Sequence, residues 1–200
     1  MLNQNTSERW GGKEMAKDNG KKDEKNKKEV DGLRTIFLSG MITEEIAKDV
    51  VQALLRLQKE DPLAPIKMII DSIGGFIDSM FAIVDTMGSV LPEIETIVVG
   101  KAMSAAATVF LCGTKGRRFM MPHSRLLFHQ VFGFSFGSTS DIVINAEEQK
   151  QLQREGSLLI ASRSNISIEE VEEMINRDFY VRPDKAIEKG FADGLVTTIS

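Results

Sequence analysis

A serine, a histidine and an acid in this sequence could together carry out nucleophilic catalysis. A serine hydroxyl attacks a carbonyl efficiently only when a base takes its proton, and the resulting oxyanion needs backbone N–H donors already in position. The chain has only two histidines, His123 and His129, so few residues could act as the base. Ser104 follows an apolar run and Gly100 and opens an apolar stretch. This order predicts a serine hydroxyl at a helix N-terminus, where N–H groups face outward.

Each of these residues also has a purely structural interpretation. Ser104 stands in the small-residue run 102–107, where a small side chain would simply let a helix pack closely, and spacing alone favours that interpretation. His129 ends the apolar run 126–128, where a histidine of the core or of an interface is common. His123 lies in a turn pattern with a proline and is predicted to be a surface residue.

The glycine pair Gly74-Gly75 has two interpretations as well. It is either a tight turn or a place where backbone N–H groups approach a substrate carbonyl, as an oxyanion hole requires. A metal site is not expected, because neither histidine has a carboxylate at ligand spacing. Cys112 is the single cysteine, so the chain can form neither an internal disulfide nor a cysteine metal cluster, which fits a reducing compartment.

The elements that must position these residues alternate between short β-rich runs and helical stretches, which predicts an α/β fold of stacked ββα or βαβ units. Strands are predicted over 35–38, 66–70, 94–99, 126–129 and about 195–199. Helices are predicted after an N-cap at Thr43, over 77–87, 102–108 and 139–163, and after Ser167. The strands 66–70 and 94–99 each run through glycine into a helix, so the two junctions should point the same way.

The chain has 200 residues, of which 42% are hydrophobic, enough for one domain with a genuine core. Residues 1–33 are polar and include a lysine-rich run, which predicts a mobile tail joined to a single domain over 34–200. The lysine run could dock an acidic partner. Its charges are nearly balanced by neighbouring acids, which favours a solvated tail.

Charge and hydropathy argue against two classes of partner. The formal net charge of −4 provides no basic field of the kind that nucleic-acid binding requires. The longest apolar run, 105–112, is far shorter than the roughly 20 residues that span a bilayer, and no apolar signal core follows the N-terminal charges. Neither a nucleic acid nor a membrane is an expected partner, and a cytoplasmic location is the default expectation.

Three blocks of sequence, each a weak signal alone, form a recognisable pattern when they are considered together. They read Gly100-Lys-Ala-Met-Ser104-Ala-Ala-Ala, Ser124-Arg-Leu-Leu-Phe-His129-Gln130 and Asn176-Arg177-Asp178-Phe179-Tyr180. Weaker matches are Asp71-Ser72-Ile73-Gly74-Gly75, Asp85-Thr86-Met87, the run 113–119 and the run 184–194. The set resembles the active-site blocks of the Clp protease proteolytic-subunit family, from about Thr35 to the C-terminus and without insertions between blocks.

The resemblance implies a serine peptidase. Ser104 would be the nucleophile, His129 the base and Asp178 the acid that orients the base, in a chain order unlike that of other triad groups. The backbone N–H groups of Gly75 and Ala105 would form the oxyanion hole. The segment 132–137 would pair with an extended substrate as an added strand. Hydrolysis would pass through an acyl-enzyme on Ser104 and would need no cofactor.

The resemblance also implies a crotonase-like ββα spiral with a protruding handle helix over 139–163. In the family, seven subunits form a ring and two rings stack through that helix as a tetradecamer around an enclosed chamber. Arg177 and Asp141 match positions that couple ring stacking to alignment of the triad. An ATP-driven unfoldase delivers unfolded protein substrates.

The sequence departs from the family pattern in several places. Ile73 stands where proline usually precedes the glycines, and Val131 stands where proline usually follows His129-Gln130. Lys67 and Ile69 replace aromatic residues of the pocket that takes an unfoldase loop. Residues 1–33 lack the family's pore loop and amphipathic helix, so docking to a standard unfoldase is the least secure expectation.

Three hypotheses from different classes follow. The first is an active serine endopeptidase that forms homomeric rings. The second is a weakly active or regulatory paralogue that works in a mixed ring with another subunit of the same kind. The third is a crotonase-type acyl-CoA enzyme, against which the intact serine, histidine and aspartate blocks argue.

Overall fold

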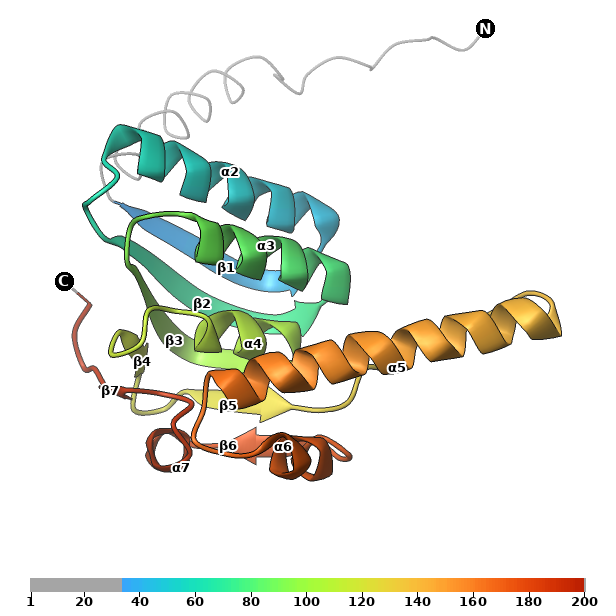
Figure 1. Ribbon diagram of the computed structural model, residues 1–200. Helices are drawn as coiled ribbons and strands as arrows, with labels where there is room; N and C mark the ends of the chain where they lie inside the picture. Colours follow the sequence, from blue (N-terminus) through green and yellow to red (C-terminus); the bar gives the residue numbers. More distant parts are fainter. Residues whose placement is uncertain (1–33, 200) are drawn as a thin grey trace, which may run out of the picture. The chain divides into compact units, whose positions relative to one another are not determined.

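The structure is a computed structural model that describes residues 34–199. A mostly parallel sheet forms its centre, as Figure 1 shows. The strands are β1 (Thr35–Ile42), β2 (Ile66–Gly75), β3 (Ile94–Met103), β4 (Arg118–Met120), β5 (Arg125–Phe128), β6 (Phe179–Val181) and β7 (Gly194–Leu195). The predictions for residues 1–33, a mobile tail with a lysine-rich docking run, lie outside the described residues.

The helices connect these strands. They are α2 (Glu44–Glu60), α3 (Ile77–Ser89), α4 (Ala105–Leu111), α5 (Thr139–Ser162), α6 (Ile168–Met174) and α7 (Pro183–Glu188). Sequence signals explain where two of them begin, because the Thr43 hydroxyl accepts the Ile46 N–H at 3.3 Å and Ser167 forms a capping box with Glu170. The predicted α/β fold is confirmed, because helices connect the strands of a single, mostly parallel sheet.

Strand β3 holds two parts of the sheet together. Its first half pairs in parallel with β4 at Thr96–Val98, and its second half pairs in parallel with β5 at Lys101–Met103. Gly100, with φ +79°, separates the two halves, a backbone conformation that glycine adopts at little cost. Beyond β5, the antiparallel strand β6 completes this branch. The branch brings the ends of β3, β5 and β6 next to one another.

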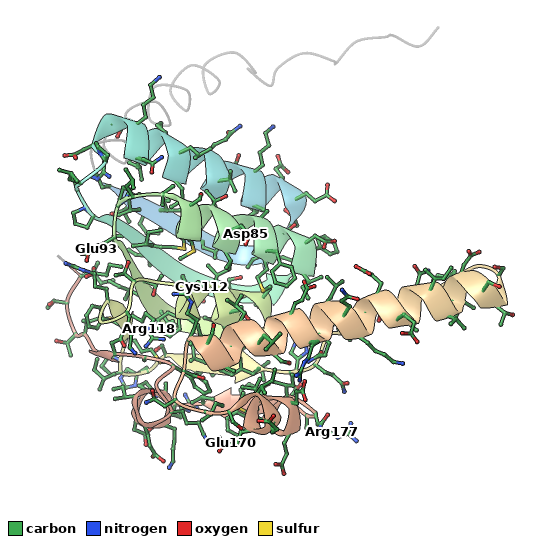
Figure 2. All side chains as sticks on the ribbon, viewed as in Figure 1. Asp85, Glu93, Cys112, Arg118, Glu170 and Arg177 are labelled. Atoms are coloured by element: carbon green, nitrogen blue, oxygen red, sulfur yellow. The ribbon has the colours of Figure 1, made fainter. Side chains whose placement is uncertain are left out.

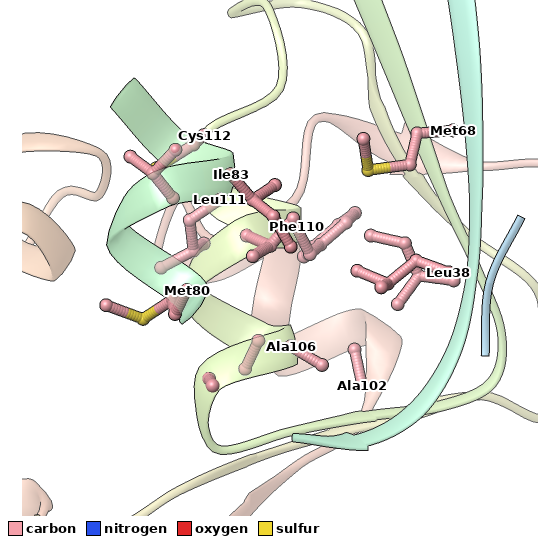
Figure 3. Close-up of a cluster of buried hydrophobic side chains, with 14 of the residues drawn as sticks. Leu38, Met68, Met80, Ile83, Ala102, Ala106, Phe110, Leu111 and Cys112 are labelled. Atoms are coloured by element: carbon pink, nitrogen blue, oxygen red, sulfur yellow. The ribbon is translucent and has the colours of Figure 1, made fainter. Parts of the chain in front are cut away.

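The core lies between the sheet and helices α2, α3 and α4, which cover one face of it (Figure 1). Phe110 of α4 is fully buried among Leu38, Met68 and Ile83 from β1, β2 and α3 (Figure 3). Every residue of α4 is buried. The hydrophobic surface that this packing removes from water is the main term that stabilises the fold, and it fixes α4 rigidly behind the end of β3.

Three strand predictions were too short. The first strand was predicted over 35–38, yet β1 runs on to Ile42. The sequence predicted that strands end at Ile70 and Val99 because glycines follow, yet β2 runs on through Gly75 and β3 through Met103. The pairing of β2 with β3 shifts register after Ile70 and continues at Ser72↔Ala102, past Gly100 of β3. Gly74 and Gly75 of β2 pair instead with Met41 and Ile42 of β1. The predicted closing strand over 195–199 is reduced to the two residues of β7.

A buried ion pair ties the end of the chain to the sheet. The side chain of Arg118 is 5% exposed, and its guanidinium donates to both carboxylate oxygens of Asp193, at 2.9 and 2.7 Å. The same guanidinium donates to the Arg163 carbonyl at 2.5 Å, beyond the end of α5. Planar two-point pairing of this kind fixes geometry as well as charge. Arg118 therefore joins β4, the end of α5 and the approach to β7.

Candidate active site

Ser104 has a strained backbone. It stands between β3 and α4 with φ 54° and ψ −127°, and it is the only non-glycine residue of the described chain with positive φ. Its N–H donates to the Leu127 carbonyl at 2.8 Å, and its carbonyl accepts from Ala107 N–H at 2.9 Å. The prediction that Ser104 opens a helix is confirmed. A sharp, strained turn from strand to helix is the setting in which a serine hydroxyl is presented to substrate.

The glycine pair lies directly beside this turn. A β-carbon on Gly74, whose φ is +87°, would come within 2.4 Å of the Met103 carbonyl oxygen and 3.0 Å of the Ala105 nitrogen. A β-carbon on Gly75 would come within 2.1 Å of the Ile42 carbonyl oxygen. Neither position can hold a side chain, because backbone atoms fill the space. The close approach is to the chain's own backbone, so both interpretations of the pair, a tight turn or an oxyanion hole, stay predictions.

A serine hydroxyl supports the glycine turn. Ser72 is fully buried, donates to the Gly40 carbonyl at 2.6 Å and accepts the Gly74 N–H at 3.1 Å. Ile73, at the position where the family usually has proline, is 54% exposed. Sequence analysis did not assign any role to Ser72. A serine two residues before a glycine turn is a usable signal for it, since such hydroxyls bond to nearby backbone groups.

His129 stands one residue past the end of β5, because the strand ends at Phe128 and not at His129 as predicted. Its Nδ1 lies 2.6 Å from the Gln130 carbonyl oxygen. A carbonyl oxygen can only accept, so Nδ1 is the protonated nitrogen in this contact and Nε2 keeps a free lone pair. That is the tautomer in which a histidine can take a proton through Nε2. No sequence pattern could have predicted this contact with a backbone carbonyl.

Asp178 comes next to His129 through strand register. The antiparallel pairs of β5 with β6 run from Leu126↔Val181 to Phe128↔Phe179, so His129 and Asp178 are the residues that directly follow and precede the last pair. Both residues line a pocket of about 660 Å³. Its other lining residues are Leu127, Gln130, Phe132, Ile175, Asn176 and Arg177. The aspartate is exposed.

The three predicted triad residues share one end of the sheet but are not hydrogen-bonded to one another. Within residues 34–199, no hydrogen bond joins His129 to Ser104 or to Asp178, and Ser104 is not among the residues that line the pocket. Ser104 and His129 are nevertheless near each other in the sheet, because the Ser104 N–H donates to the carbonyl of Leu127, two residues before His129.

The model of the Clp protease family matches residues 19–199 of this chain. The chain belongs to the Clp protease family. Membership identifies a protease of the hydrolase class and weighs against the acyl-CoA hypothesis. Proteins of the Clp protease family form oligomeric rings. In the described part of the chain, no helix is long and apolar enough to cross a membrane.

Arg177 and Asp141, the two residues predicted to couple ring stacking to the triad in this Clp family member, do not form an ion pair with each other within the described residues. Arg177, labelled in Figure 2, is exposed. It lines the same pocket as Asp178. Asp141 is bound within its own chain, since it forms the capping box of α5 with Ser138.

The single cysteine, Cys112, and the second histidine, His123, are not among the residues that line this pocket. Burial raises the pKa of the Cys112 thiol to about 11, so little of it is the reactive thiolate at neutral pH. His123 is exposed, as predicted, and lines a separate pocket of about 480 Å³ with Arg182, Asp184 and hydrophobic neighbours. Within residues 34–199, no three His, Cys, Asp or Glu side chains form a group that could hold a metal ion.

Proposed function

We propose that this Clp family member is a serine endopeptidase subunit that hydrolyses unfolded polypeptides through an acyl-enzyme on Ser104. The observation that carries the proposal is the left-handed backbone of Ser104 against the glycine pair. A non-glycine residue held in such a backbone conformation lowers the stability of the fold by on the order of 1–3 kcal/mol. Such strain persists only where the surrounding structure enforces it, and here Leu127 and Gly74 do so.

In the proposed mechanism, Ser104 Oγ attacks the substrate carbonyl carbon while His129 Nε2 takes the hydroxyl proton. The N–H groups of Gly75 and Ala105 stabilise the oxyanion. Ala105 suits this role because it is the first residue of α4, and the first N–H groups of a helix have no acceptor within it. The imidazolium then gives its proton to the leaving amine, and a water molecule, activated by His129, releases the acyl group.

Asp178 has to replace the Gln130 carbonyl as the partner of His129 Nδ1 in this mechanism. A carboxylate stabilises the imidazolium that forms during attack far better than a neutral carbonyl does. We assign Arg177 and Asp141 the role of coupling subunit assembly to this exchange. Release of Asp141 from its capping box would free its carboxylate for a partner on another subunit.

The second candidate, a weakly active or regulatory subunit of a mixed ring, has one observation in its favour. The single chain holds His129 against Gln130, with no bond to Ser104 or Asp178. In that case the triad forms only beside a different Clp subunit. Catalytic hydrogen bonds are often long or misaligned before substrate binds, so we place the active homomeric enzyme first.

Assembly into rings is supported by the surface of α5. Of its residues only Ser157 and Ile160 are buried, while Ile142, Val143 and Ile144 are 42%, 54% and 64% exposed. Large apolar side chains exposed on a helix in this way call for a protein partner. We propose heptameric rings stacked as a tetradecamer, and a monomer in sedimentation at micromolar concentration would contradict it.

The proposed partner beyond the ring is an ATP-driven Clp unfoldase, with a weakened docking face. Lys67 Nζ lies 3.8 Å from a Glu95 carboxylate oxygen, and the two side chains are 19% and 22% exposed. An apolar loop that docked here would have to cover this ion pair, which is costly unless the charges stay paired. Ile69, two residues along β2, faces the same side of the sheet.

The proposed function is tested by labelling with a fluorophosphonate probe and by hydrolysis of a short apolar peptide. Ser104→Ala should remove labelling and reduce hydrolysis by several powers of ten, because triad residues act as a unit. Ser89→Ala, at an exposed serine on α3, is the matched control and should change neither. Labelling of the wild-type homomer without hydrolysis would favour the regulatory subunit. Residual peptidase activity in Ser104→Ala would exclude Ser104 as the nucleophile.

A further inference from the structure

The segment 131–137, between β5 and α5, runs back along α5 and is tied to it by polar side chains. Figure 1 shows this connection leaving β5 and reaching the far end of the helix. Gln153 accepts the Val131 N–H, and Asn145 Nδ2 donates to Ser135 Oγ at 3.1 Å. The segment belongs to no strand of the described sheet. Its path is therefore set by the helix and not by a neighbouring strand.

The ties repeat with a regular spacing. The helix residues involved are Asp141, Asn145, Gln149 and Gln153, each four after the last. Asp141 accepts from the Ser138 N–H and hydroxyl. Gln149 lies beside Gly133, whose β-carbon would come within 3.4 Å of the amide, a packing contact and not a hydrogen bond. Such residues form one row on a helix surface, inclined about 26° to its axis. Four helical residues rise about 6 Å, and two extended residues span about 6.6 Å. Alternate residues of the segment can thus meet successive residues of the row.

The same arithmetic fixes the conformation of the segment. Eight helical residues separate Asn145 from Gln153, a rise of about 12 Å. The four steps along the chain from Val131 to Ser135 can span at most about 13 Å. The segment must therefore be almost fully extended between the two ties.

An alternation in the sequence follows from this arrangement. The helix-facing positions hold valine, glycine, serine and glycine, which allow close approach to α5. The positions between them hold Phe132, Phe134 and Phe136, which are 75%, 82% and 86% exposed. The Phe132 and Phe134 rings meet edge to face with centroids 6.2 Å apart, as expected for neighbours on one side of an extended chain.

Gln153 is itself held in place and acts close to His129. Its Nε2 donates to Ser157 Oγ at 3.3 Å, and Ser157, 1% exposed, donates to the Gln153 carbonyl at 2.9 Å. The residue between His129 and Val131 is also fixed, because the Gln130 N–H donates to the Ile175 carbonyl at 2.8 Å. The two residues that follow the candidate base are thus anchored to α5 and to the end of α6.

We propose that Gln153 is a positioning residue for His129, and that Gln149 and Asn145 continue its row as a polar ladder that holds segment 131–137 extended with its phenylalanines outward. The part that concerns His129 rests on the proposed peptidase function. The ladder itself rests only on contacts within the chain. Gln153 touches no reacting atom; it acts through the Val131 backbone.

The test compares three variants of the full-length chain in its native assembly. Gln153→Leu removes both hydrogen bonds of the side chain, whereas Gln153→Glu keeps an acceptor for the Val131 N–H. Gln151→Leu is the matched control, because Gln151 is an exposed glutamine on the same helix, off the ladder. Amide hydrogen exchange is measured for the peptide that covers 131–137, and kcat and KM are measured for a short peptide substrate.

Gln153→Leu should speed exchange in that peptide at least tenfold and lower kcat about tenfold, while Gln151→Leu changes neither. Gln153→Glu should restore most of the protection and most of kcat. Unchanged exchange in Gln153→Leu, or equal effects in Gln151→Leu, would overturn the ladder whatever the activity. Faster exchange with unchanged kcat would overturn the positioning of His129. An inactive wild type with the expected exchange differences would instead contradict the proposed function and leave the ladder standing.

Discussion

Gly74 packs directly against Ser104: a β-carbon at position 74 would lie 2.8 Å from the Ser104 Cβ. Gly74→Ala should therefore displace the serine turn and lower fluorophosphonate labelling at least a hundredfold, since φ at this position is +87° and disfavours any side chain. Gly88→Ala is the control, because a β-carbon there meets nothing within 4 Å. It should keep full labelling and leave the free energy of unfolding unchanged or higher by up to about 1 kcal/mol. Normal labelling in Gly74→Ala would show that the turn tolerates a side chain.

Asp178→Asn tests whether the Asp178 carboxylate or the Gln130 carbonyl is the functional partner of His129 Nδ1. The variant should lower kcat for a short peptide by about 10²–10⁴, because an amide cannot stabilise the imidazolium of the transition state. Asp184→Asn, at another exposed carboxylate in the first turn of α7, should change kcat less than twofold. If Asp178→Asn kept ordinary kcat, the Gln130 carbonyl and not Asp178 would be the group that orients the base.

The sequence predicted the local features of this fold better than those that depend on distant pairing. Hydroxyl caps at Thr43 and Ser167 were readable because the signal and the helix lie within a few residues. The continuation of β3 to Met103 was missed, since Gly100 looks like a break until its parallel partners in β4 and β5 are known. The resemblance named Ser104, His129 and Asp178 together, but the contact of His129 with the Gln130 carbonyl depends on a ring orientation that no sequence pattern encodes.

The Arg118–Asp193 pair makes stability depend on pH in a defined range. Partial burial alone would raise the pKa of Asp193, but hydrogen bonds from the Arg118 side chain and backbone, its positive charge and the Gly116 N–H together lower it from the ordinary 3.8. A lowered folded pKa contributes stability that is fully present above the unfolded value and is lost as the pH falls through the folded value. Stability should thus fall below about pH 4.

Asp193→Asn measures this contribution. At about pH 6 the variant should unfold in urea with a free energy lower by about 3 kcal/mol, because it leaves the buried Arg118 without a counter-charge. The difference from wild type should shrink as the pH falls below 3.8. Asp49→Asn, at an exposed residue of α2, should unfold like the wild type throughout. A difference that stayed constant down to low pH would mean that the Asp193 charge is not what stabilises the fold.

Lys67 should limit cooperation with a standard Clp unfoldase. Rings made only of this chain should hydrolyse short peptides yet degrade a tagged folded protein slowly when unfoldase and ATP are added, because the docking loop must cover the Lys67–Glu95 pair. Replacing Lys67 and Ile69 by tyrosine should increase ATP-dependent degradation severalfold without changing peptide hydrolysis. Efficient degradation by the unmodified homomer would show that no companion subunit is required.

The bond between Arg118 and Asp193 has a consequence for synthesis of the chain. The two residues are 75 positions apart. At about 5–20 residues per second, a ribosome needs about 4–15 s to add the residues between them. During that time the emerging chain carries an arginine destined for the interior without its carboxylate, and burial of that unpaired charge is costly. The Arg118–Asp193 contact therefore cannot form until Asp193 has been synthesised, so this part of the fold closes after the strands and helices that precede it in the chain.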